Sequence, residues 1–87
     1  MRKEVRQEIE ARLYNPLSEE WEKVINLQVE QLSKPQQRLY TLRYKKRQTE
    51  RQICDALHIE RATYYNWVST LIHDVALQAA YHNLIKP

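Results

Sequence analysis

The chain has 87 residues, 29% of them charged and 43% hydrophobic, with no glycine, three prolines and a single cysteine, Cys54. This composition suits one small folded domain and argues against a disordered tail or a disulfide framework, so we expect a reducing, cytoplasmic setting. The charged amino terminus does not have the apolar stretch of a signal peptide, and no uncharged run is long enough to span a membrane. We therefore expect no membrane association.

Charge is unevenly distributed along the sequence, whose formal net charge is +3. Residues 1–32 hold five Lys and Arg against seven Glu, a net of −2. Residues 33–70 hold eight Lys and Arg against three acidic residues, a net of +5, and residues 71–87 hold one of each sign. This asymmetry predicts a polyanionic partner for the middle of the chain.

Strong helix formers dominate the chain and no stretch alternates between polar and apolar residues, so we predict an all-α fold, a small helical bundle. A first helix is expected over 2–13, ended by Asn15-Pro16 because the residue before proline avoids the α conformation. A second helix begins after the N-cap Ser18 and runs to about Leu32. Its buried side is formed by Trp21, Ile25, Val29 and Leu32.

The next two helices each open with a capping box. Segments 33–36 (SKPQ) and 49–52 (TERQ) place a hydroxyl residue three positions before a glutamine, which satisfies free N–H groups at a helix start. Tyr40 and Tyr44 are expected near the edge of the third helix. The residues expected to face inward from the third and fourth helices are Leu39, Leu42, Ile53, Cys54 and Leu57.

The fifth helix is expected to start near Glu60, as its N-cap, and to be long. His58 stands in the turn before it, where a positive φ is needed, and His tolerates this region better than most residues other than glycine. The buried side of this helix is formed by Tyr64, Trp67 or Val68, Leu71, Ile72, Val75 and Ala79. Two helices joined by such a turn, with Ile59 filling the corner, predict a helix-turn-helix.

Segments 32–44 (LSKPQQRLYTLRY) and 49–71 (TERQICDALHIERATYYNWVSTL) resemble region 4 of bacterial sigma factors, including its helix-turn-helix. The chain is similar to the small phage-encoded late-gene regulators of the ArpU/RinA kind, which share that domain. In them an Arg-Tyr pair precedes a basic linker, and a signature like residues 61–65 starts the recognition helix. The resemblance implies a phage or prophage transcriptional regulator that binds DNA.

A recognition helix places its first turns in the major groove, where its side chains reach base edges. Arg61 is the expected main reader because its planar fork matches the O6 and N7 atoms of guanine. A surface ion pair with Glu60 or Asp55 is the alternative role for this arginine. The other expected base-reading residues are Ala62, Thr63, Tyr65 and Asn66, whereas Tyr64 points into the core.

Side chains before and at the start of the fourth helix are expected to contact DNA phosphates: Arg43, Lys45, Lys46, Arg47, Thr49 and Arg51. The free N–H groups and positive dipole end of that helix favour the same role. For Arg43, a structural ion pair with Glu50 or Asp55 is the alternative. About six such contacts would lower the DNA affinity by about 10³-fold between 50 and 200 mM salt.

We predict two regions in the chain. Residues 1–32 form a helical region that serves as a lid over the helix-turn-helix or as a homodimer surface, and residues 33–87 form the DNA-binding region with its long last helix. Double-stranded DNA is the expected partner; the alternatives are a phage packaging protein like a terminase small subunit, or a sigma-like adaptor that docks RNA polymerase. The sequence has no glycine-rich phosphate loop and no metal-ligand spacing, so we expect no enzyme, cofactor or metal.

Overall fold

The computed structural model describes residues 1–85, and these are all-helical, which confirms the predicted fold class. The last two residues of the predicted DNA-binding region, 86–87, lie outside the described part of the chain. In order, the elements are α1 (Lys3–Tyr14), α2 (Glu19–Glu30), α3 (Lys34–Tyr40), η1 (Thr41–Lys45), α4 (Glu50–Leu57) and α5 (Arg61–Tyr81). The element η1 is a π-helical continuation of α3.

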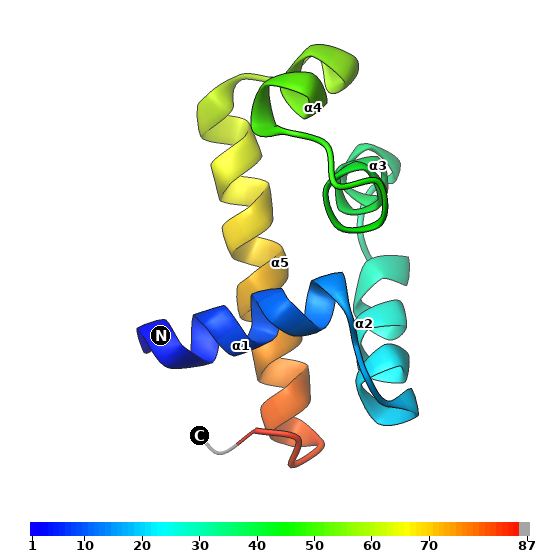
Figure 1. The fold of residues 1–87 in the computed structure, drawn as a ribbon, viewed down its shortest axis with the longest axis vertical. Coiled ribbons are helices and arrows are strands. Elements are labelled where there is room, and N and C mark those ends of the chain that lie inside the picture. Colours follow the sequence, from blue (N-terminus) through cyan, green and yellow to red (C-terminus); the bar gives the residue numbers. More distant parts are fainter. Residues whose placement is uncertain (86–87) are drawn as a thin grey trace.

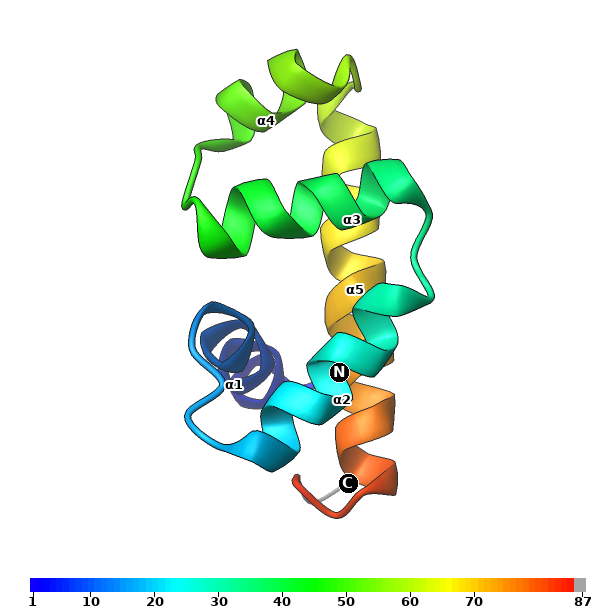
Figure 2. The same cartoon turned by 90° about the vertical axis from the view of Figure 1, so that its right-hand side faces the viewer.

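The long helix α5 organises the molecule (Figures 1 and 2). Helices α1 and α2 both pack against it, and the two figures show them beside its carboxyl-terminal half. The α3–η1 helix crosses α5 nearer the amino-terminal end of α5, and α4 lies across the first turns of α5. No helix of residues 1–85 is both long and apolar enough to cross a membrane.

One hydrophobic core runs through both predicted regions of the chain. It takes Ile9 from α1, Ile25 from α2 and Ile53 from α4, together with the inner side of α5. Ile72 and Val75 of α5 are fully buried. Since burial of one such side chain contributes about 1.5–3 kcal/mol, helices α1 and α2 stabilise the same folded unit as α4 and α5.

The predicted helix starts are confirmed at three places. The Ser18 hydroxyl accepts a hydrogen bond from the Trp21 N–H at the start of α2. Both reciprocal bonds of the capping box are present at 33–36, where α3 begins, and at 49–52, where α4 begins. Helix α2 ends at Glu30, slightly earlier than expected. These starts form reliably because a cap requires only residues within four positions of each other.

The predicted edge position of Tyr40 and Tyr44 is wrong, because both tyrosines are buried. The ring centroid of Tyr44 lies 4.7 Å from that of Tyr14 in α1 and 5.7 Å from that of Tyr40. Helix α1 covers this side of η1, and periodicity within one helix cannot show which neighbour will cover it. In α5, Val68 is the core residue and Trp67 is partly buried.

Candidate nucleic-acid interface

A tight turn joins α4 to α5. His58 ends α4 in the left-handed region, at φ 54° and ψ 45°, as predicted. The Ile59 N–H donates to the Cys54 carbonyl at 3.2 Å, and the Ile59 side chain packs against the core. Glu60 stands at the N-cap position of α5, but its side chain makes no capping hydrogen bond. The geometry is consistent with the predicted helix-turn-helix.

The first two turns of α5 present the predicted base-reading residues to solvent. Four of them are exposed, namely Arg61, Ala62, Tyr65 and Asn66, whereas Thr63 is half-buried. Tyr64 is buried in the core, as expected. Figures 1 and 2 show α1 and α2 away from this end of α5. The exposed side of α5 is therefore open to a partner along its first two turns.

Glu50, in the first turn of α4, binds two of these residues. Its Oε1 atom lies 2.7 Å from the Nε atom of Arg61, and its Oε2 atom accepts a hydrogen bond from the Tyr65 hydroxyl. The Arg61 guanidinium also lies 5.7 Å from the centroid of the Tyr65 ring. We call Glu50, Arg61 and Tyr65 the outer triad. The ion-pair partner of Arg61 is thus Glu50, and not Glu60 or Asp55 as the sequence suggested.

The outer triad is largely open to water, because the Arg61 side chain is 75% exposed and that of Glu50 is 29% exposed. The Tyr65 hydroxyl and then the Glu50 carboxylate raise the pKa of Arg61. The ion pair with Glu50 is made through the Nε atom of the guanidinium, and the Tyr65 hydroxyl is its second polar neighbour.

The basic run between η1 and α4 lies on the surface, with Lys45, Lys46 and Arg47 all exposed. Arg47 adopts a φ of 53°, which stops the helix and turns the chain toward α4. Two of the three cations rest over aromatic rings, at 5.8 Å for Lys45 over Tyr40 and 5.0 Å for Arg47 over Tyr14. Such packing of the side-chain stems leaves the charged groups near water.

At the amino end of α4, the predicted phosphate contacts are Thr49 and Arg51, and both are exposed. The Thr49 hydroxyl accepts from the Gln52 N–H at 3.2 Å, so it serves as a cap in the free protein. The first N–H groups of the helix have no partner in the preceding turn, which is the general property that attracts anions to helix starts.

Arg43 differs from the other predicted phosphate contacts, because its guanidinium is bound inside the protein. It forms an ion pair with Glu10 of α1 and donates to the Tyr64 hydroxyl. We call Glu10, Arg43 and Tyr64 the inner triad. Of the two predicted roles, the geometry fits the structural ion pair, although its partner is Glu10 and not Glu50 or Asp55. No local pattern pointed to this partner, because it is 33 positions away.

Aromatic rings surround the inner triad. The Arg43 guanidinium lies 5.2 Å, 5.8 Å and 6.0 Å from the ring centroids of Tyr44, Tyr64 and Tyr14. Burial lowers the pKa of Arg43, but its interactions with Glu10 and Tyr44 outweigh burial, so this pKa is raised. Burial also raises the pKa of Tyr44 and of Tyr64. Both tyrosines therefore stay neutral near pH 7, and Glu10 supplies the negative charge.

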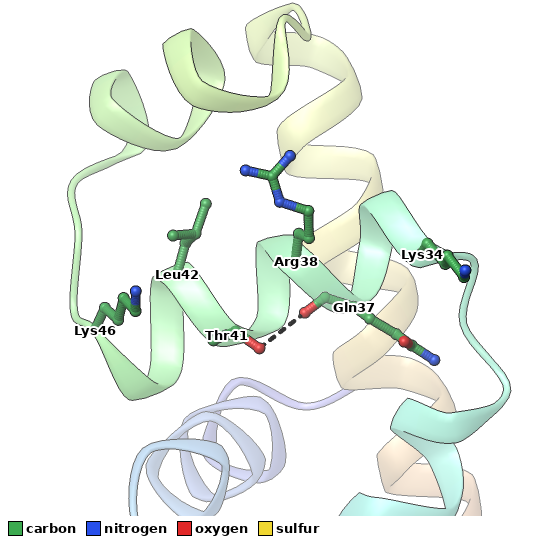
Figure 3. Close-up of a pocket in the computed structure, with 6 residues that line it drawn as sticks. All are labelled: Lys34, Gln37, Arg38, Thr41, Leu42 and Lys46. Carbon is green, nitrogen blue, oxygen red and sulfur yellow. Dashed lines mark hydrogen bonds between the residues drawn. The ribbon is translucent and has the colours of Figure 1, made fainter.

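A groove along α3 and η1 contains two cations, Lys34 and Arg38, that are not among the predicted site residues (Figure 3). Its lining residues are Lys34, Gln37, Arg38, Thr41, Leu42 and Lys46. Three of these are cationic and none is acidic. Arg38 points toward α4 in Figure 3, and Lys34 and Lys46 lie at opposite ends of the groove. The spacing of Lys34 and Arg38, one helical turn apart, is the sequence signal that could have found them.

A metal or redox role finds little support in the described residues. No group of three or more His, Cys, Asp or Glu side chains in residues 1–85 could hold a metal ion. Cys54 is a free, partly buried thiol that packs against the core. Burial and then the charge of Glu50 raise the pKa of this thiol, which keeps it protonated and poorly nucleophilic.

Residues 4–76 match the family described as protein of unknown function DUF1492. The match covers well over half of the chain, which therefore belongs to this family. It begins in α1 and ends within α5, so it spans the boundary predicted at residue 32 and includes the whole candidate interface. Nothing among the curated proteins or the solved structures matches the chain.

Proposed function

We propose that this chain is a sequence-specific, double-stranded DNA-binding transcriptional regulator. The observation that carries the proposal is the open start of α5, which follows a tight turn and displays Arg61, Tyr65 and Asn66. An α-helix fits the major groove. There, arginine forms bidentate hydrogen bonds with guanine, and asparagine forms them with adenine. The resemblance of 32–44 and 49–71 to sigma region 4 supports a phage or prophage regulator of the ArpU/RinA kind.

The distribution of charge supports the same function. Exposed cations lie before α4, at Lys45, Lys46 and Arg47, and further ones line the groove of α3 and η1. DNA carries one negative charge per about 1.7 Å of helix axis, so a protein with clustered cations gains affinity by releasing counterions. In this proposal α5 reads the bases, whereas the basic run and the amino end of α4 contact phosphates. Arg43 has no phosphate-binding role here, because Glu10 already holds it.

The test is a selection of bound sequences from random DNA, followed by fluorescence anisotropy on the selected site and on an altered site. Arg61→Ala should lower the affinity for the selected site by about 1–3 kcal/mol and relax the preference at one base pair. Lys46→Ala should weaken all sequences alike and reduce the slope of log affinity against log salt by about 0.9. Lys23→Ala in α2 removes the same charge near the carboxyl end of α5, away from the start of that helix, so it should change neither the affinity nor the salt slope.

Two results would redirect the assignment. If no DNA is selected and the chain instead binds purified RNA polymerase, the sigma-like adaptor replaces DNA reading as the function. If DNA is selected but Arg61→Ala leaves every base preference unchanged, the recognition surface is not the start of α5. A packaging protein like a terminase small subunit would be indicated by a selected site that lies in packaging-initiation DNA and not in a promoter.

A homodimer is part of the proposal, because two recognition helices one DNA turn apart read a longer site than one. Exposed apolar side chains on the far half of α5, Leu77 and Tyr81, lie one turn apart and well beyond the first two turns that carry the proposed base readers. A contact there would leave the start of α5 free in both copies. Light scattering at micromolar concentration should give twice the mass of one chain. A mass equal to that of one chain would rule out the homodimer.

A further inference from the structure

A carboxylate stands in the middle of the proposed DNA-reading surface, where repulsion by phosphates makes it unexpected. Glu50 lies in the first turn of α4 and uses both of its oxygens on α5, one on Arg61 and the other on Tyr65. These two residues are one turn apart on the exposed side of that helix. The carboxylate therefore links the start of α4 to the reading side of α5.

We propose that Glu50 is a positioning residue that sets the base specificity of Arg61; this inference rests on the proposed DNA binding. The ion pair uses the Nε atom of Arg61, at 2.7 Å from Glu50. The Nη1 and Nη2 atoms, at the other end of the guanidinium, are a parallel pair of donors, which is the arrangement that guanine O6 and N7 accept. Glu50 thus selects the face of the guanidinium that DNA meets.

The same contacts reduce the freedom of a long side chain before DNA arrives. Arg61 is 75% exposed and would otherwise sample many rotamers. The carboxylate holds one edge of the guanidinium, and the Tyr65 ring lies beside it at 5.7 Å. Since Tyr65 is itself bound to Glu50, the three side chains order one another. A side chain ordered in its bound orientation loses less conformational entropy on binding.

A purely repulsive role for Glu50 makes the opposite prediction. If the carboxylate only opposed phosphates, its removal would strengthen binding to all DNA sequences alike. If it positions Arg61, its removal lowers discrimination between the correct base pair and a wrong one, whether or not total affinity rises. The ratio of the two affinities, and not either affinity alone, separates the roles.

The experiment measures this ratio on the selected site and on the same site with its Arg61-dependent base pair replaced. The wild-type ratio should be about 10-fold or more. Glu50→Ala should bring it to about twofold, and Glu50→Gln, which keeps the shape of the side chain but not its charge, should give an intermediate value. Asp55→Asn removes a neighbouring exposed carboxylate of α4 and should leave the ratio as in the wild type.

A double variant connects the effect to the arginine. In an Arg61→Ala background, adding Glu50→Ala should cause no further loss of discrimination, because there is no guanidinium left to position. Circular dichroism and urea unfolding on each variant verify that the fold is intact. A ratio that stays at the wild-type value in both Glu50 variants overturns the inference while leaving DNA binding in place. A wild-type chain that binds no DNA removes the proposed function and this inference together.

Discussion

The inner and outer triads are built from the same three residue types and occupy opposite surroundings. Each joins an arginine to a glutamate from another helix and to a tyrosine of α5, and the two tyrosines are the neighbours Tyr64 and Tyr65. In the inner triad the Arg43 and Glu10 side chains are 22% and 23% exposed, whereas Arg61 in the outer triad is 75% exposed.

The solvent exposure of each triad decides what it can do. An ion pair in water contributes about 0–1 kcal/mol, whereas removing one partner of a buried pair leaves an uncompensated charge and costs several times more. The inner triad fastens α1 and η1 to α5, and its guanidinium is enclosed by tyrosine rings. In the outer triad, by contrast, the Arg61 side chain is largely exposed to solvent. The same chemistry is therefore structural at one site and suited to a ligand at the other.

The largest expected effect on stability comes from a substitution that breaks the inner triad. Arg43→Ala leaves Glu10 partly buried without its cation, and we expect the free energy of unfolding to fall by about 2–3 kcal/mol. Urea denaturation followed by circular dichroism measures it. Arg43→Lys keeps the charge without the planar fork and should cost less than the alanine variant. A loss below about 0.5 kcal/mol for Arg43→Ala would show that this pair behaves like a surface pair.

The two adjacent tyrosines provide a matched comparison of the triads. Tyr64→Phe removes the hydroxyl that accepts from Arg43 and should lower the free energy of unfolding by about 1–2 kcal/mol, because a partly buried charged donor loses one of its two acceptors. Tyr65→Phe removes a hydroxyl that binds Glu50 at the surface, so we expect less than about 0.5 kcal/mol. Equal losses in the two variants would contradict the difference in depth.

The turn that brings the members of the outer triad together is the next test. His58 holds a left-handed conformation that strongly disfavours a β-branched residue, so His58→Val should destabilise the protein by about 1–2 kcal/mol. His58→Gly should leave stability unchanged or slightly increased, because glycine adopts this region without a steric penalty. Thermal unfolding of both variants measures the difference, and similar midpoints would indicate that the turn does not need this conformation.

The smallest expected effect concerns the outer triad itself. Arg61→Ala should change the free energy of unfolding by less than about 0.5 kcal/mol, because the ion pair is exposed to water. The same variant carries the largest effect proposed for DNA affinity. A stability loss as large as that of Arg43→Ala would mean that Arg61 is a structural residue, and its assignment as a base reader would lose its basis.

The sequence was informative wherever the determinants are local. Ser18, the boxes at 33–36 and 49–52, and the turn at His58 all appear where they were expected, because each depends on residues within about four positions. The periodicity of α5 likewise predicted its buried side. The exposed start of that helix followed from the same pattern, so most of the candidate base-reading residues could be named from the sequence.

Only the tertiary structure decided the pairings between distant segments. The partner of Arg43 is 33 positions away in α1, and the burial of Tyr44 depends on that same helix packing over η1. Glu50 meets Arg61 only because the turn lays α4 across the start of α5. Composition and periodicity report which faces of a helix are apolar, but not which charged residue of another helix will reach them. The choice between a structural arginine and one open to a ligand therefore came from packing, because solvent exposure is a property of the folded neighbours and not of the local sequence.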